Sequence, residues 1–180
     1  FYTGDSLVCK QESPERNAHF KKFELSDEEN LFLIQMVKEG GAIPMASVWS
    51  LDMLKWTNPH LPYHKVGSGD LTCYPILAAL VKTKKPIILS TGLSSLSEVT
   101  GAVEYIKKCD LSYITDKKLA LLQCTSSYPT PDEDVNLAVM QTLKNKFGLP
   151  VGYSDHTIGS NAIEAAVAMG AEIIEKHFTD

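Results

Sequence analysis

The sequence lacks any apolar run that approaches the roughly 20 residues needed to span a bilayer as a helix. Its first residues also lack a charged segment followed by an apolar one, the pattern of a secretory signal. Basic residues are not in surplus either, since the formal net charge is -5 and the isoelectric point is near 5.5. Nucleic-acid and anionic-membrane binders need clustered Lys and Arg. We therefore expect a cytoplasmic protein that binds neither nucleic acid nor membrane.

Cysteine is sparse, with four residues that are widely spaced and form no CxxC pair. This pattern disfavours a disulfide framework or a cysteine-based metal site and is typical of buried thiols in a reducing compartment. Walker-type and GxGxxG loops are also missing, so the usual nucleotide-phosphate loops are excluded. A composition that is 44% hydrophobic and 22% charged nevertheless predicts one ordinary folded domain.

Short apolar runs, each bounded by Gly, Pro or Ser, alternate with amphipathic stretches from residue 26 onward. Such runs are typical of strands that are buried on both faces of a parallel sheet. The predicted strands are Ala42 to Ser47, Tyr63 to Ser68, Pro86 to Thr91, Lys118 to Thr125, Pro150 to Ser154 and Glu172 to Phe178.

Helices are predicted between these strands. Capping boxes begin two of them, at Ser26 and at Ser95, and three more are expected at Tyr74 to Lys82, Asp132 to Phe147 and Ala162 to Met169. Residues 1 to 25 carry no clear period and are predicted to be irregular, which leaves 26 to 180 as the folded domain. About six βα units fit either a doubly wound open sheet or an incomplete eight-stranded barrel. Periodicity does not decide between them.

Every predicted strand ends in polar residues, and in α/β barrels the catalytic groups project from that edge. His156 and His177 follow consecutive strands, so their imidazoles can converge on one metal ion, with Asp155 and Glu175 as partners that orient the rings. Core or capping histidines remain an alternative. Lys65, on an apolar strand, needs an anionic partner, which is either a ligand phosphate or Asp70.

Five segments of the sequence resemble the N-acetylneuraminate (sialic acid) synthase family. They are KVGSGD (65 to 70), PIILSTGLSSLSEV (86 to 99), LLQCTSSYPTPDEDVNL (121 to 137), GLPVGYSDHTIG (148 to 159) and IIEKHFTD (173 to 180). The resemblance implies a TIM (β/α)8 barrel enzyme that condenses phosphoenolpyruvate with N-acetylmannosamine or its 6-phosphate in the presence of Mn²⁺ or Mg²⁺. It also implies a homodimer in the full-length protein.

The same resemblance assigns roles to individual residues. His156 and His177 become the metal ligands, and Asp70 becomes an acidic residue beside the reacting centre. The resemblance also assigns six substrate-binding residues: Ser47, Lys65, Ser68, Ser90, Ser126 and Ser154. Of these, Lys65 is also assigned a catalytic role. Ser126 stands where some members of the family have Asn.

The barrel is expected to be incomplete in this chain. By comparison with the family, the first two strands and the C-terminal antifreeze-like domain are absent. Two other functions stay open: a related nonulosonic acid synthase that makes legionaminic or pseudaminic acid, and a barrel module without catalytic activity.

Overall fold

The computed structural model describes residues 15, 18 and 21–178, and it divides the chain into two compact units, residues 1–64 and 65–180. The predicted irregular segment, 1 to 25, lies mostly outside the described residues, although Glu15, Ala18 and Lys21 are helical. Its boundary with the expected folded domain falls inside the first unit and stays a prediction.

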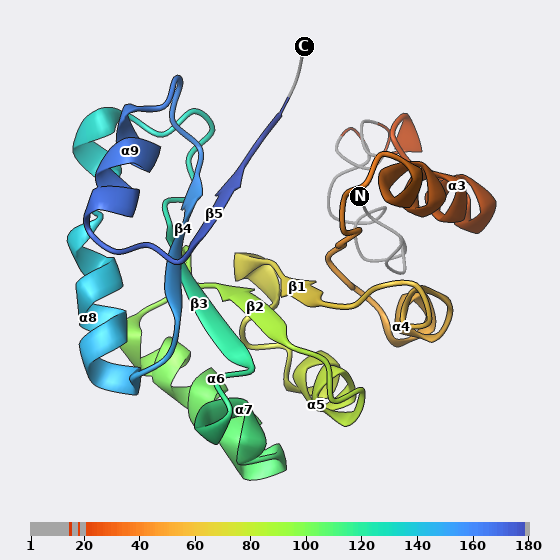
Figure 1. The fold of residues 1–180 in the computed structure, drawn as a ribbon, viewed down its shortest axis with the longest axis horizontal. Helices are drawn as coiled ribbons and strands as arrows, with labels where there is room; N and C mark the ends of the chain where they lie inside the picture. Colours follow the sequence, from red (N-terminus) through yellow and green to blue (C-terminus); the bar gives the residue numbers. More distant parts are fainter. Residues whose placement is uncertain (1–14, 16–17, 19–20, 179–180) are drawn as a thin grey trace. The chain divides into compact units, whose positions relative to one another are not determined.

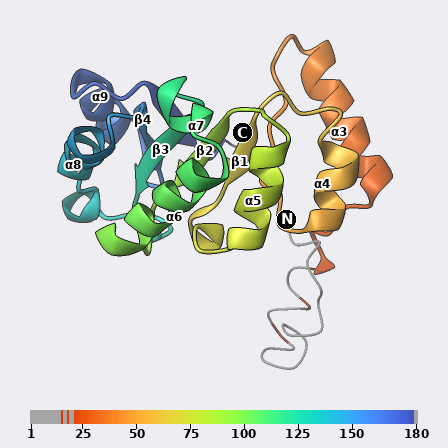
Figure 2. The ribbon, with the colours of Figure 1, turned by 90° about the horizontal axis from the view of Figure 1, so that it is seen from below.

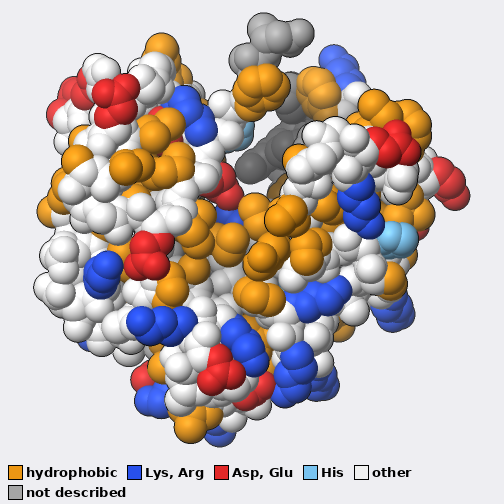
Figure 3. All heavy atoms as spheres, viewed as in Figure 1, with side chains coloured by type: hydrophobic (Ala, Val, Ile, Leu, Met, Phe, Trp, Pro, Cys, Tyr) orange, Lys and Arg blue, Asp and Glu red, His pale blue; other side chains and the backbone are white. Residues whose placement is uncertain are grey.

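The first unit contains helices α3 (Asp27–Glu39) and α4 (Leu51–Thr57). The predicted capping box begins α3, because the Ser26 side chain accepts a hydrogen bond from the backbone of Glu29, whose carboxylate accepts one from the Ser26 backbone. No residue of α3 is buried, and apolar side chains reach the surface over it (Figure 3). Among them are Phe32, Leu33, Met36 and Val37.

The predicted strand from Ala42 to Ser47 is wrong. Only Ser47 has β-type pairing, as a single bridge residue. Pro44 lies in the middle of this run and lacks the N–H that a continuous ladder requires, which explains why an apolar segment of this length does not form a strand.

The second unit is built around a five-stranded sheet (Figure 1). Its strands follow one another across the sheet in chain order, and β2 to β5 pair in parallel. They are β1 (His64–Val66), β2 (Ile87–Ser90), β3 (Leu119–Cys124), β4 (Val151–Asp155) and β5 (Ile173–Lys176). Four of them lie within runs that the sequence predicts, and β4 extends one residue beyond its predicted end at Ser154. β3 and β4 are buried along their whole length.

Helices cover one face of this sheet, as Figures 1 and 2 show from two directions. They are α5 (Tyr74–Lys82), α6 (Leu96–Cys109), α7 (Ser112–Thr115), α8 (Ala138–Phe147) and α9 (Asn161–Ala168). Leu80, Ile106 and Leu143 are among the buried side chains that pack these helices on the strands. Sequential strand order with helices on one face is the arrangement of a barrel segment, whereas a doubly wound sheet reverses its strand order and carries helices on both faces.

The predicted helix from Asp132 to Phe147 is wrong in its first half. Asp132–Asp134 forms a short 3₁₀ turn, and α8 begins only at Ala138. Asn136 separates the two with a φ of 51°, a left-handed conformation that an α-helix cannot contain. No helix in the described part of the chain is long and apolar enough to cross a membrane.

Candidate functional site

Four polar side chains meet on the face of the sheet opposite the helices. Lys65 is buried, and its Nζ donates a hydrogen bond of 2.8 Å to Ser90 Oγ. The same ammonium lies 3.5 Å from Glu175 Oε2, while the other oxygen of Glu175 accepts a hydrogen bond of 2.7 Å from Ser154 Oγ. β1, β2, β4 and β5 thus contribute one residue each to a connected cluster.

The ion pair between Lys65 and Glu175 requires the sheet to be curled. Three strands separate β1 from β5, and at about 4.8 Å per strand a flat sheet would hold them about 19 Å apart. The two side chains together cannot span that distance. The face that carries this cluster is therefore concave, and residues from the two ends of the sheet lie within reach of one ligand.

A second group of polar atoms surrounds Gly92, just after β2. Ser68 Oγ accepts a hydrogen bond of 2.9 Å from the Gly92 N–H and lies 3.1 Å from Cys124 Sγ. A Cβ atom at Gly92 would lie 2.6 Å from both Cys124 Sγ and Ser126 Oγ and 2.9 Å from Ser68 Oγ. Only glycine therefore allows these side chains to converge, and the structure brings Ser68 and Ser126, both predicted substrate-binding residues, to the same place.

The two imidazoles also converge. The ring centroids of His156 and His177 are 5.4 Å apart. His156 Nδ1 lies 2.7 Å from the carbonyl oxygen of Thr125; a hydrogen bond there places a proton on Nδ1, and in the neutral ring Nε2 then keeps its lone pair. Tyr128 stacks on His156 at 4.0 Å between ring centroids and meets His177 edge-on at 5.5 Å.

Sequence reasoning missed Tyr128 and the Thr125 carbonyl. The sequence could have indicated both, because they lie in TSSYPTP, the loop that directly follows the predicted strand Lys118 to Thr125.

The side chains near the two histidines indicate which divalent metal ions could bind there. Two converging imidazoles suit a transition-metal ion, whereas Mg²⁺ prefers oxygen ligands. No group of three or more His, Cys, Asp or Glu side chains within the described ranges is arranged to hold a metal ion. The two histidines alone would supply only part of a coordination sphere, so a metal ion held by them would need further ligands from outside these four residue types.

The structure gives Asp155 and Glu175 partners other than the imidazole rings. Glu175 contacts Lys65 and Ser154, as described above. Asp155 is fully buried and lies 2.5 Å from Lys176 Nζ. Burial raises the pKa of the Asp155 carboxyl, but hydrogen bonds from Lys176, Thr157 and Tyr153 outweigh burial and hold the pKa below its ordinary value.

Asp70 lies in the 3₁₀ turn Ser68–Asp70 that follows β1 and is half-buried. Burial raises the pKa of its carboxyl, and the positive charge of Lys65 offsets only part of that rise. Among the side chains that the structure describes, Lys65 forms its ion pair with Glu175 and not with Asp70. The alternative of a Lys65–Asp70 salt bridge is therefore wrong, although the two groups are close enough to interact electrostatically.

Ser47, predicted to bind substrate, belongs to the first unit and is half-buried there. Its role stays a prediction. The other predicted site residues all belong to the second unit.

A cavity of about 410 Å³ lies beside the site, at the carboxyl ends of β2 and β3. Its lining includes Gly92, Cys124 and Ser126, together with Val99 of α6 and Leu143 of α8. Lys65 and the histidines do not line it, so its volume does not measure the pocket around them.

Comparison with known proteins places these features in a family context. The NeuB family model matches residues 5–180. An uncharacterized protein of Methanocaldococcus jannaschii is 43% identical over 180 residues, which cover 99% of this chain and 51% of that protein. The N,N'-diacetyllegionaminic acid synthase of Legionella pneumophila is 40% identical over 176 residues, with 94% and 49% covered. The chain thus spans about half the length of the curated relatives it matches.

A solved structure gives the same result for the fold. The N-acetylneuraminic acid (sialic acid) synthetase of Leptospira borgpetersenii superposes with a TM-score of 0.87 at 34% sequence identity. The match covers 97% of this chain and 59% of that one.

Proposed function

The chain belongs to the NeuB family, and from this premise we propose that its protein condenses phosphoenolpyruvate with the aldehyde of an N-acyl amino sugar. The proposed acceptor is N-acetylmannosamine or its 6-phosphate, and the products are N-acetylneuraminate or its 9-phosphate and inorganic phosphate. The similarity to a sialic acid synthetase across 97% of the chain supports this choice. A complete (β/α)8 barrel, a homodimer and a cytoplasmic location belong to the same proposal.

The observation that carries the proposal is the buried Lys65 ammonium on the same concave face as two converging imidazoles. The ammonium donates to Ser90 Oγ and to the Val66 carbonyl oxygen and pairs with a single carboxylate, and a buried cation of this kind is suited to an anionic ligand. We assign the phosphate and carboxylate of phosphoenolpyruvate to Lys65 and to serine hydroxyls at neighbouring strand ends: Ser68, Ser90, Ser126 and Ser154. Ser47 is proposed to complete the substrate pocket.

His156 and His177 are the residues that would hold Mn²⁺ or Mg²⁺, and their nitrogen donors favour Mn²⁺ of the two. When bound, such an ion supplies Lewis acidity for the aldehyde oxygen. The protein contributes the geometry, because the Thr125 carbonyl fixes the His156 ring with Nε2 available and Tyr128 packs against both rings.

Lys65 and the serines orient phosphoenolpyruvate so that its C3 faces the aldehyde carbon within bonding reach. As the C–C bond forms, positive charge develops at C2 of phosphoenolpyruvate. Water adds there, and phosphate leaves from the resulting tetrahedral centre. We assign Asp70 to stabilising that charge or removing a proton from the water, because its half-buried carboxyl has a raised pKa.

A second acceptor is favoured by one observation. The legionaminic acid synthase of Legionella pneumophila matches 94% of the chain at 40% identity, a higher identity than that of the sialic acid synthetase. The amino sugar from which legionaminic acid is made is therefore the second candidate, and the acceptor of the pseudaminic acid synthases is a further one. A barrel module without catalytic activity is the remaining alternative.

Phosphate release from phosphoenolpyruvate, measured with Mn²⁺ and a panel of amino sugars, tests the proposal on the purified protein. We expect release to require both an N-acyl amino sugar and the metal, and the acceptor with the highest kcat/KM identifies the product. The matched control is Lys144→Met, which removes an exposed lysine on α8 and leaves turnover unchanged. Titration calorimetry with phosphoenolpyruvate and Mn²⁺ decides the third alternative, since a module without a site gives no heat of binding.

A further inference from the structure

The residues immediately before the two histidines form an ion pair across β4 and β5. Asp155 and Lys176 face each other in the register of the two strands, and Lys176 Nζ lies 2.5 Å from Asp155 Oδ2. The ammonium also donates a hydrogen bond of 2.8 Å to the carbonyl oxygen of Thr157. Lys176 therefore binds the residues on both sides of His156 in the sequence: Asp155 through its side chain and Thr157 through its backbone.

The Asp155 carboxylate is bound on all sides. Its Oδ1 accepts hydrogen bonds from the Tyr153 hydroxyl at 3.1 Å and from the Thr157 N–H at 3.0 Å, and its Oδ2 accepts one from Thr157 Oγ1 at 3.2 Å. With Lys176 added, four donors converge on a carboxylate that has no exposed surface. Such a fully satisfied network fixes one geometry, because any displacement leaves a buried polar atom unpaired.

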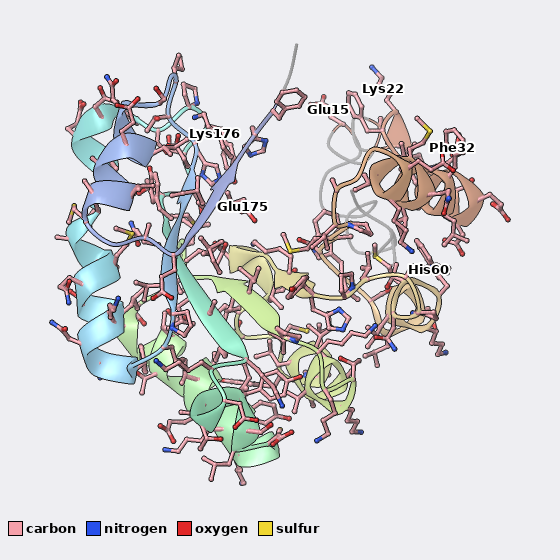
Figure 4. All side chains as sticks on the ribbon, viewed as in Figure 1. Glu15, Lys22, Phe32, His60, Glu175 and Lys176 are labelled. Carbon is pink, nitrogen blue, oxygen red and sulfur yellow. The ribbon has the colours of Figure 1, made fainter. Side chains whose placement is uncertain are left out.

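This network lies on the face of the sheet away from the imidazoles. Successive side chains of a strand point to opposite faces, and in Figure 4 Glu175 and Lys176 leave β5 on opposite sides. Glu175 is on the face that carries Lys65 and Ser154. Asp155 and Lys176 therefore do not contact the groups assigned to substrate or metal, and any influence on them passes through the strands.

The position of His177 depends on the register of β5, which needs such a constraint. β5 is four residues long and lies at the edge of the sheet formed by the described residues, and its Ile174 is 36% exposed. Burial therefore contributes little to its register. A shift by one residue turns every side chain to the opposite face, which would take His177 away from His156.

We propose that Asp155 and Lys176 are positioning residues that lock β5 against β4 so that His156 and His177 face one metal ion. This inference rests on the proposed function, since that function assigns the ion to the two histidines. Neither residue acts on substrate. Their effect is to keep the two ring centroids at the observed 5.4 Å.

The test compares Lys176→Met with Lys176→Arg, which keeps the charge, and with Lys144→Met as a matched control. Lys144 also forms an ion pair, with Glu172, but both members of that pair are exposed. Mn²⁺ affinity is measured from the electron paramagnetic resonance signal of the free ion. We expect Lys176→Met to weaken binding by about 10- to 100-fold, as loss of a partner outside the metal ligands usually does, with most of the affinity restored in Lys176→Arg.

A readout without metal separates this inference from the proposed function. Nuclear Overhauser contacts between the His156 and His177 rings report their proximity in the metal-free protein. Loss of these contacts in Lys176→Met supports the positioning role even if the wild-type protein binds no Mn²⁺, an outcome that would overturn the metal assignment alone. Wild-type ring contacts and wild-type Mn²⁺ affinity in Lys176→Met would overturn the positioning role.

Removing Lys176 alone leaves a buried carboxylate without its cation, which can prevent folding. The double variant Asp155→Asn, Lys176→Gln avoids this problem because it removes both charges and keeps hydrogen-bonding groups of similar length. We expect the double variant to fold and to show weakened ring contacts. Undiminished contacts in that variant would also overturn the proposal.

Discussion

Replacing Gly92 with alanine tests the arrangement of the serine cluster most directly. The added methyl group would lie 2.6 Å from Cys124 Sγ and from Ser126 Oγ, and 2.9 Å from Ser68 Oγ. These three atoms belong to short side chains, and Cys124 is only 6% exposed, so they have little room to move. Overpacking of this kind costs about 1–3 kcal/mol of folding stability.

The same substitution should weaken phosphoenolpyruvate binding. The Gly92 N–H donates to Ser68 Oγ at 2.9 Å, and displacement of that hydroxyl would cost the ligand a hydrogen bond to a charged group, worth about 1.5–3 kcal/mol. Because about 1.4 kcal/mol corresponds to a factor of ten, we expect the dissociation constant to rise by about 10- to 100-fold. Urea unfolding and titration calorimetry measure the two effects separately.

Gly101→Ala is the matched control. Its added methyl would lie 3.2 Å from the Tyr74 hydroxyl, the end of a flexible side chain, and alanine is favoured over glycine inside a helix by up to about 1 kcal/mol. We expect unchanged ligand affinity and unchanged or improved stability. The reasoning is refuted if Gly92→Ala matches the wild-type protein in both stability and affinity.

Three further predictions concern single residues. His156→Ala should abolish Mn²⁺-dependent turnover, and wild-type rates at saturating Mn²⁺ would contradict the ligand assignment. Burial raises the pKa of Asp70 above its ordinary value of 3.8, so its carboxyl loses its proton at a higher pH than an exposed aspartate does. The acidic limb of the kcat/KM profile should therefore lie above pH 3.8, and it should disappear in Asp70→Asn. Burial raises the pKa of the Tyr113 hydroxyl from 10.0 to about 12, so the neutral phenol is favoured in the folded state. Its stabilising effect should be complete below pH 10 and lost between pH 10 and 12. Urea unfolding midpoints of the wild type and of Tyr113→Phe across that range check this.

Strands and helices could be predicted where burial dominates the local sequence. Leu119 to Cys124 is buried throughout, and its continuous apolar run was sufficient to place β3. The pattern failed where one residue overrides it: Pro44 prevents a strand, and Asn136, with a left-handed backbone, prevents a helix. Hydrophobic spacing carries no information on either effect.

Local sequence patterns indicate which strand carries each candidate residue, but they do not indicate which side chains pair. The position of each residue on or just after a strand follows from local patterns, and the structure has Lys65 on β1 and Ser154 on β4. Which carboxylate meets Lys65 depends on the curl of the sheet, which brings β1 close to β5 and so selects Glu175. Curl is a property of the whole sheet, and no single segment of the sequence determines it.

The contact between Lys65 and Glu175 also affects which anions can enter the pocket. The incoming ligand does not meet an isolated cation, because a carboxylate already neutralises the ammonium from 3.5 Å away. A ligand that binds Lys65 therefore replaces Glu175 as the partner of the ammonium. The free energy of binding is the difference between the attraction of Lys65 to the ligand and its attraction to Glu175. A singly charged anion supplies no more negative charge than the Glu175 carboxylate that it replaces. A multiply charged ligand would gain more than it displaces, so the ion pair would favour a multiply charged anion, such as the proposed phosphoenolpyruvate, over chloride or acetate.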